Sequence, residues 1–144
     1  MICVSVAESK VEGCRKALEG LEFAEVRLDC LEASIEDVQT IFSGPVRLIA
    51  TFMPGKPQKN AIHTDTGDET RKRFLIAAIE AGATYVDIEI DSDDQYRKEI
   101  MEKARSNKCQ VIISFHDFLG TPDEDVLEKI RTGCFEKGAD VAKI

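Results

Sequence analysis

Two kinds of segment alternate along the whole chain. Short runs rich in apolar and β-branched residues, typical of strands, are separated by longer runs whose apolar residues recur at helical spacing. The expected strands are residues 1–7, 23–30, 46–52, 84–90, 109–118 and 139–144, and the expected helices are residues 11–18, 34–42, 69–81, 94–107 and 122–137. Strict alternation predicts an α/β fold in which right-handed β-α-β units build a parallel sheet.

The most suitable architecture for such units is a (β/α)8 TIM barrel. We expect residues 1–144 to form a single barrel domain that supplies about six strands and five helices, with the seventh and eighth units absent. Complete barrels usually have about 200 residues or more. An open doubly wound sheet would also explain the length, but no GxGxxG or GxxxxGK[ST] motif follows the first strand.

Composition narrows the class of ligand and the compartment. The chain has a net charge of -8 and no visible basic patch, so we expect no nucleic-acid or membrane partner and a small-molecule ligand instead. The five cysteines form no CxxC pair, which favours buried thiols over a disulfide framework or a zinc site. Without a leader or a membrane-spanning apolar stretch, a cytoplasmic location is expected.

Several charged residues stand in strands that should be almost wholly apolar if helices covered both faces of the sheet. Side chains alternate along a strand, so Glu25, Arg27 and Asp29 share one face of the second strand. Asp87 and Glu89 do the same on the fourth strand. Burial of unpaired charges would be prohibitive, so this face is expected to line a polar interior where the charges pair or bind a ligand.

The last two strands add a histidine and a lysine to that face. Residues 121–124 (TPDE) predict a capping box with Pro122 at the first helical position, which places His116 at the carboxyl end of the strand before it. Ligands bind at the carboxyl ends of parallel strands. One polar cluster is therefore expected, made of Glu25, Arg27, Asp87, Glu89, Ser114, His116 and Lys143.

A lysine near a histidine and carboxylates suits the chemistry of carbonyl compounds. A neutral amine adds to a ketone or aldehyde, and the resulting iminium acidifies the neighbouring carbon. A histidine, with an ordinary pKa of about 6.5, moves protons near neutral pH. Other interpretations stay open: His116 as a structural hydrogen-bonding residue, Lys143 as a solvated charge, and residues 25–29 as a structural ladder of ion pairs.

Four motifs, in order along the chain, resemble those of the type I 3-dehydroquinate dehydratase family. Residues 25–29 (EVRLD) resemble its E-[LVW]-R-x-D, and residues 86–89 (VDIE) its D-x-E. Residues 114–122 (SFHDFLGTP) resemble S-x-H-D-F-x-x-T-P, and residues 139–144 (ADVAKI) resemble A-D-x-x-K-I. The resemblance covers the whole chain and implies the N-terminal two-thirds of such an enzyme.

This resemblance implies a Schiff-base lyase of aromatic amino acid (chorismate) biosynthesis, which converts 3-dehydroquinate into 3-dehydroshikimate and water. By resemblance, Lys143 would form an imine with the C3 ketone, and His116 would remove the C2 proton and protonate the departing hydroxyl. The implied substrate-binding residues are Glu25, Arg27, Asp87, Glu89 and Ser114. The family needs no metal or organic cofactor, and its members are commonly homodimers.

Three departures from the family pattern keep alternatives open. The T-x-R pattern after the third strand is Thr51-Phe52-Met53 here, and residues 54–57 (PGKP) lack the glutamate that orients the histidine in many members. The strand-seven arginine and strand-eight loop would lie beyond Ile144. A non-catalytic fragment or degenerate homologue is therefore the alternative. Another class I Schiff-base lyase, such as an aldolase, fits the chemistry but not the histidine motif.

Overall fold

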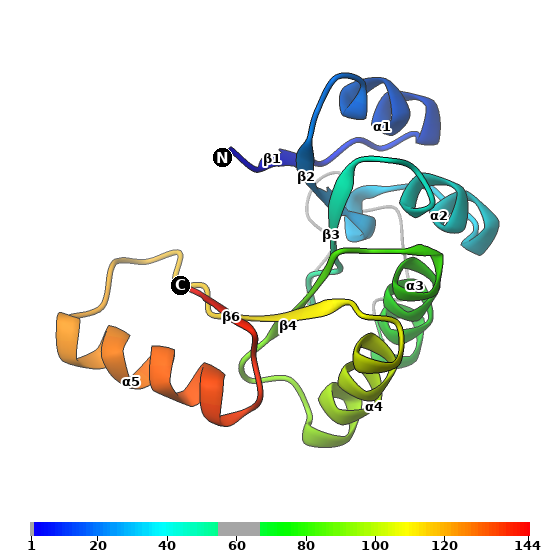
Figure 1. Ribbon diagram of the computed structural model, residues 1–144. Helices are drawn as coiled ribbons and strands as arrows, with labels where there is room; N and C mark the ends of the chain where they lie inside the picture. Colours follow the sequence, from blue (N-terminus) through cyan, green and yellow to red (C-terminus); the bar gives the residue numbers. More distant parts are fainter. Residues whose placement is uncertain (1, 55–66) are drawn as a thin grey trace.

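The computed structural model describes residues 2–54 and 67–144, and its strands and helices alternate as predicted (Figure 1). The strands are β1 (Val4–Val6), β2 (Phe23–Arg27), β3 (Arg47–Thr51), β4 (Tyr85–Glu89), β5 (Gln110–Ser114) and β6 (Val141–Lys143). The helices are α1 (Val11–Leu18), α2 (Ile35–Phe42), α3 (Asp68–Ala81), α4 (Asp94–Ser106) and α5 (Glu124–Glu136), with a short 3-10 helix, η1 (Leu28–Cys30), after β2.

The strands form one parallel sheet. Within the described residues it has six strands in the order β1-β2-β3-β4-β5-β6, and each strand is parallel to its neighbours. In Figure 1, α1 to α4 follow one another along one side of this sheet. Sequential parallel order is that of a barrel wall, whereas a doubly wound sheet reverses its order. The predicted fold class, part of a (β/α) barrel, is confirmed.

The core lies between the sheet and these helices. Its fully buried large side chains include Val26, Val38, Phe42, Leu48, Leu75, Ile79, Ile88, Ile100 and Ile113. Strand side chains alternate between faces, so when the apolar residues pack under the helices, the charged residues between them point to the opposite, interior side of the sheet. Burial of one such large apolar side chain stabilises the fold by about 1.5–3 kcal/mol.

Local hydrogen bonds fix where α2 and α3 begin and end. At the start of α2, Ser34 Oγ accepts from Asp37 N at 3.1 Å, and Asp37 Oδ2 accepts from Ser34 N at 3.0 Å, which completes the capping box. These bonds, with one from the Ser34 hydroxyl, hold the pKa of Asp37 below its usual value. At the end of α3, Gly82 adopts φ +114°, a left-handed conformation that suits glycine.

The predicted start of α5 is wrong. The helix begins at Glu124, and Asp123 is its N-cap without a side-chain hydrogen bond, so residues 121–124 form no capping box and Pro122 precedes the helix. The preceding segment makes a turn, in which Asp117 Oδ1 accepts from Leu119 N at 2.8 Å and Gly120 N at 3.3 Å.

All six strands are shorter than predicted, and the early ends of β2 and β5 affect the site. β2 ends at Arg27 because residues 28–30 turn into η1, and β5 ends at Ser114. The last sheet hydrogen bonds there are Ile90 N to Ser114 O and Phe115 N to Lys143 O. His116 therefore lies just beyond the carboxyl end of β5 and not within the strand.

The cysteines are free thiols, as expected, but one of them is exposed. Cys14, Cys30, Cys109 and Cys134 are buried, whereas Cys3 is exposed beside β1, so the prediction of five buried thiols is wrong at that position. Burial raises the pKa of Cys109 to about 12 and that of Cys14 to about 11, which keeps these thiols protonated. Among the described residues, no helix is long and apolar enough to cross a bilayer.

Exposed apolar side chains gather near the two outer strands of the sheet. Among the described residues, the large ones are Ile2, Val4, Phe118, Leu119, Val126, Phe135, Val141 and Ile144. All belong to the segment of β1 or to the chain after β5. Within the described sheet, β1 and β6 each have a single strand neighbour, so both present an open edge.

Candidate active site

Lys143 connects strands that are distant in the sheet. Its Nζ donates to Glu25 Oε1 at 2.9 Å and to Asp87 Oδ2 at 2.8 Å. These partners belong to β2 and β4, neither of which is a neighbour of β6. The sheet must curl for such contacts to form, so the lysine reaches across the concave interior of the barrel wall.

Glu25 is held by hydroxyl groups from both neighbouring strands. Ser5 Oγ on β1 donates to Oε2 at 2.7 Å, and Thr51 Oγ1 on β3 donates to Oε1 at 2.9 Å. Burial alone would raise the pKa of Glu25, but the hydrogen bonds from Lys143, Ser5 and Thr51 outweigh it and lower the pKa. Glu25 is therefore an anion at neutral pH with a fixed orientation.

Asp87 is buried, and both of its carboxylate oxygens have a donor. Ser114 Oγ, from the neighbouring strand β5, donates to Oδ1 at 2.5 Å, while Lys143 occupies Oδ2. Buried polar groups need such partners, because an unmade hydrogen bond in the interior is costly. Ser114 and Asp87 together therefore form a rigid support beneath the lysine.

The charge state of Lys143 follows from this environment. Its side chain is 39% exposed. Burial lowers the pKa of Lys143, but the hydrogen bonds and charges of Asp87 and Glu25 together outweigh burial and raise the pKa above its ordinary value. The resting side chain is an ammonium, which must lose a proton before it can act as a nucleophile. The two carboxylates are the nearest acceptors for that proton.

Arg27 is bound to Asp29 and not to the lysine cluster. Its Nε donates to Asp29 Oδ1 at 2.9 Å and its Nη2 to Oδ2 at 2.6 Å, a two-point ion pair. Met53 N also donates to Asp29 Oδ1, at 3.3 Å. Asp29 thus links the end of β2 to the segment after β3 and holds the guanidinium of Arg27 at the carboxyl end of the sheet.

Glu89 has a different partner, one that sequence reasoning missed. Arg71 on α3 has a side chain only 4% exposed, and its Nη2 donates to Glu89 Oε2 at 2.7 Å. Its Nη1 binds Asp68, and its Nε donates to the carbonyl of Phe52 at 3.3 Å. The available signal was position: Arg71 shares the helical spacing of the buried residues Phe74, Leu75 and Ala78.

Burial dominates the acidity of Glu89. It raises the pKa of this carboxyl to about 7, and the charge of Asp87 acts in the same direction, while Arg71 favours the anion and opposes them. Glu89 therefore changes its protonation state near neutral pH.

His116 lies in a cavity beside this pair. The cavity has a volume of about 260 Å³ and is lined by residues including Met53, Glu89, Ser114 and His116. The imidazole stacks on Phe118, with 6.0 Å between ring centroids and 9° between planes. Its Nδ1 is buried and has no hydrogen-bond partner among the described residues.

The residues that were expected to form a single cluster instead form three neighbouring groups. The structure brings Lys143, Glu25, Asp87 and Ser114 together, binds Arg27 to Asp29, and binds Glu89 to Arg71 next to His116. Ser5, Thr51, Asp29 and Arg71 are supporting residues that the predicted cluster did not include. Among the described residues, no group of three or more histidine, cysteine, aspartate or glutamate side chains is arranged to hold a metal ion.

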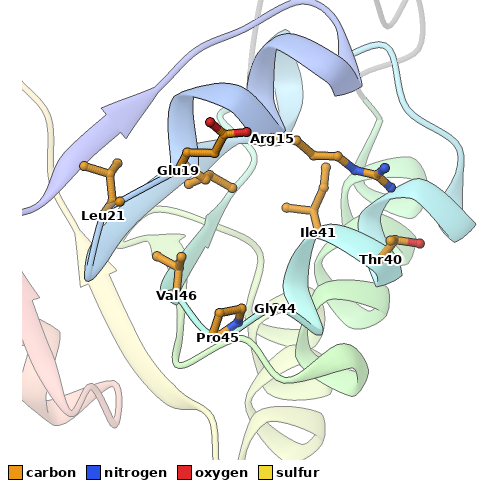
Figure 2. A pocket seen from close by; sticks show the side chains of 10 residues that line it. Arg15, Glu19, Leu21, Thr40, Ile41, Gly44, Pro45 and Val46 are labelled. Atoms are coloured by element: carbon orange, nitrogen blue, oxygen red, sulfur yellow. The ribbon is translucent and has the colours of Figure 1, made fainter.

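A separate cavity lies at the other end of the sheet. Figure 2 shows it between α1 and α2, near the starts of β2 and β3, with Leu21, Ile41, Pro45 and Val46 among its lining residues. Its volume is about 380 Å³, and it includes none of the predicted site residues. In parallel barrels, ligands bind at the carboxyl ends of the strands, so the candidate site is the end that carries Lys143 and His116.

Comparisons with known proteins agree with this geometry. The family model described as type I 3-dehydroquinase matches residues 2–144. A 3-dehydroquinate dehydratase of Methanococcoides burtonii is 30% identical over 150 residues, which cover 99% of this chain and 63% of that protein. The enzyme of the same name from Methanopyrus kandleri is 33% identical over 95% of this chain and 60% of its own length. The chain thus spans about three-fifths of these relatives.

Solved structures share the fold. A type I 3-dehydroquinate dehydratase from Clostridium difficile superposes with a TM-score of 0.82 at 22% identity, over 99% of this chain and 60% of that one. The 3-dehydroquinate dehydratase from Enterococcus faecalis gives a TM-score of 0.80 at 20% identity, over 99% of this chain and 64% of that one. Since the family model spans nearly every residue, the chain belongs to the type I 3-dehydroquinase family.

Proposed function

We propose that this chain carries 3-dehydroquinate dehydratase chemistry, the elimination of water from 3-dehydroquinate to give 3-dehydroshikimate in aromatic amino acid biosynthesis. The observation that supports this most is the position of Lys143, whose ammonium bridges Glu25 and Asp87 across the interior of the sheet. A lysine that was only a solvated surface charge would not need to bind two carboxylates from distant strands.

The proposed reaction starts when the partly exposed ammonium of Lys143 loses a proton to solvent. The neutral amine then adds to the C3 carbonyl, and loss of water from the adduct leaves an iminium. The iminium withdraws electrons, so His116 can remove the C2 proton and leave an enamine. The enamine expels the C1 hydroxyl, which takes the proton from His116 and departs as water. Hydrolysis of the iminium then releases the product and restores Lys143.

The other predicted residues are proposed to bind the substrate or to hold the lysine. Glu25 and Arg27 are the candidates for contacts with the substrate hydroxyls, because both present polar groups at the interior face. Asp87 and Ser114 are proposed to act mainly through Lys143, since both are buried in this cluster, whereas Glu25 and Arg27 are partly exposed. Glu89 faces the cavity of His116.

The setting of this activity is also a proposal. We propose a cytoplasmic homodimer in which residues 1–144 form a single barrel domain and 3-dehydroquinate is the only ligand, without a cofactor, a nucleic acid or a membrane partner. The buried free thiols suit a reducing compartment. The relative from C. difficile was solved with covalently modified comenic acid, which supports covalent chemistry as a property of this family.

A non-catalytic homologue is the second candidate. Met53 favours it, because the family places an arginine where this chain has a thioether. Loss of one positioned cation can remove several kcal/mol of transition-state stabilisation, on the order of 3 kcal/mol. In this case the lysine cluster would be inherited structure without turnover.

Borohydride trapping separates the two candidates. The chain is incubated with 3-dehydroquinate, reduced, digested and analysed by peptide mass spectrometry. We expect an adduct at Lys143 that disappears in Lys143→Met. Lys72→Met is a matched control, because Lys72 also binds two carboxylates, Glu69 and Glu99, but lies on the outer helix α3. An unlabelled wild-type chain would contradict the proposed activity and favour the non-catalytic homologue.

A further inference from the structure

Burial of the Arg71–Glu89 ion pair costs free energy, which suggests a role beyond packing. Removing two charges from water is expensive, and apolar residues of similar volume would fill the same space without that cost. Arg71 binds Glu89 through Oε2 and packs its guanidinium 4.9 Å from the ring centroid of Tyr96. The pair therefore holds the carboxylate of Glu89 in one orientation at the wall of a cavity.

The register of the sheet places that carboxylate beside His116. Glu89 on β4 is in register with Ser114 on β5, and His116 follows two residues later in the chain, just beyond the end of β5. Glu89 and His116 line the same cavity.

In the part of the chain that the structure describes, the Nδ1 of His116 lacks a hydrogen-bond acceptor, and Glu89 carries carboxylate oxygens that accept hydrogen bonds. The buried Nδ1 of His116 has no hydrogen-bond partner among the described residues, and the carboxylate of Glu89 accepts from Arg71 through Oε2 and from a backbone N–H. We propose that Glu89, held by Arg71, is the positioning residue of His116 and accepts a hydrogen bond from its Nδ1–H through Oε1. This role rests on the proposed function, since it serves the proton transfers assigned to His116.

This contact would select one tautomer of the imidazole. With the proton on Nδ1, the lone pair of Nε2 is free to take the C2 proton of the substrate, and the carboxylate stabilises the imidazolium that forms. Arg71 completes the arrangement, because its charge favours the anionic form of Glu89 that can accept the hydrogen bond.

Several groups around Glu89 set the pH range in which the contact exists. Arg71 and Asp68 approach from α3, Asp87 lies on the same strand, Tyr96 on α4 and Asp91 after β4. Burial raises the pKa of Glu89 to about 7. The acceptor is therefore available above about pH 7 and is lost as the pH falls through that value.

Nitrogen-15 NMR of the histidine rings tests the proposal without substrate. The chain has two histidines, so a His63→Gln background leaves His116 alone in the spectrum. At about pH 8, where an ordinary imidazole is neutral, we expect the His116 proton on Nδ1. The Arg71→Met/Glu89→Leu double variant removes the acceptor without leaving a buried charge unpaired, and there we expect the proton on Nε2.

Arg97→Met is the matched control, because Arg97 is a similarly buried arginine that binds Asp94 on α4 away from the cavity. It should leave the tautomer unchanged. A proton on Nε2 in the His63→Gln protein, or one that stays on Nδ1 in the double variant, overturns the proposal. The readout needs no imine, so a failed trapping experiment with the Nδ1–H tautomer present would reject the proposed activity and leave the positioning contact standing.

Discussion

Individual side chains decide the chemistry of this site, and Glu89 is the residue whose titration can be measured directly. Burial raises its pKa to about 7, far above the value of about 4.3 for an exposed glutamate. In a chain labelled with carboxyl carbon-13 glutamate, the resonance missing from Glu89→Gln should titrate with a midpoint near pH 7. Arg71→Met removes the cation that favours the anion, so its midpoint should be higher. A wild-type midpoint below pH 5 would contradict the described burial.

The nucleophile gives the second prediction at this scale. Asp87 and Glu25 raise the pKa of Lys143 against the opposing effect of burial. Asp87→Asn keeps the shape and removes one charge, so the pH profile of borohydride trapping at Lys143 should move to lower pH. Lys72→Met, on the outer face, should leave the profile unchanged. A profile that moves to higher pH in Asp87→Asn would mean that the carboxylate does not hold the ammonium.

The sequence predicted which residues lie in the site better than it predicted which of them bind one another. Charges at alternate strand positions located Glu25, Asp87 and Lys143 on one face, and the structure joins them. Arg71 was missed because a helix supplies it, and alternation along strands carries no information about the side chains of helices. Which carboxylate binds which cation depends on how far the sheet curls, a property that no local pattern contains.

At the scale of elements, the capping box of α2 should carry a measurable part of the stability. Ser34→Ala removes the acceptor for Asp37 N and should lower the free energy of unfolding by about 1 kcal/mol. Ser43→Ala is the matched control at the other end of the same helix, where the hydroxyl bonds only to an exposed carbonyl, and should change it by less than about 0.5 kcal/mol. Urea unfolding measures both, and equal losses would contradict a special role for the cap.

The sequence predicted the type and order of the elements and missed several of their ends. Apolar periodicity reports burial, and burial continues beyond the last sheet hydrogen bond, so β2 and β5 were predicted too long. The start of α5 was misplaced because the pattern at 121–124 does not form its side-chain cap: Asp123 is the N-cap and makes no side-chain hydrogen bond.

At the scale of the whole molecule, alternation of strands and helices was enough to predict the barrel wall. The sequence did not reveal where the apolar surface would gather. The structure places Val4 in one edge strand and Val141 in the other, both exposed. Edge strands with exposed apolar side chains pair readily with other chains.

A polypeptide of residues 1–144 should therefore associate with itself in a concentration-dependent way. Lysine on an edge strand opposes such pairing, because the next chain would have to bury its charge. In sedimentation velocity, the sedimentation coefficient of Val4→Lys/Val141→Lys should depend less on concentration than that of the parent chain. Gln39→Lys/Ser43→Lys adds the same charge to the exposed surface of α2 and should not weaken it. A parent chain that stays monomeric from micromolar to millimolar concentration would show that the edge strands do not drive association. If both lysine pairs weaken association equally, net charge and not strand pairing governs it.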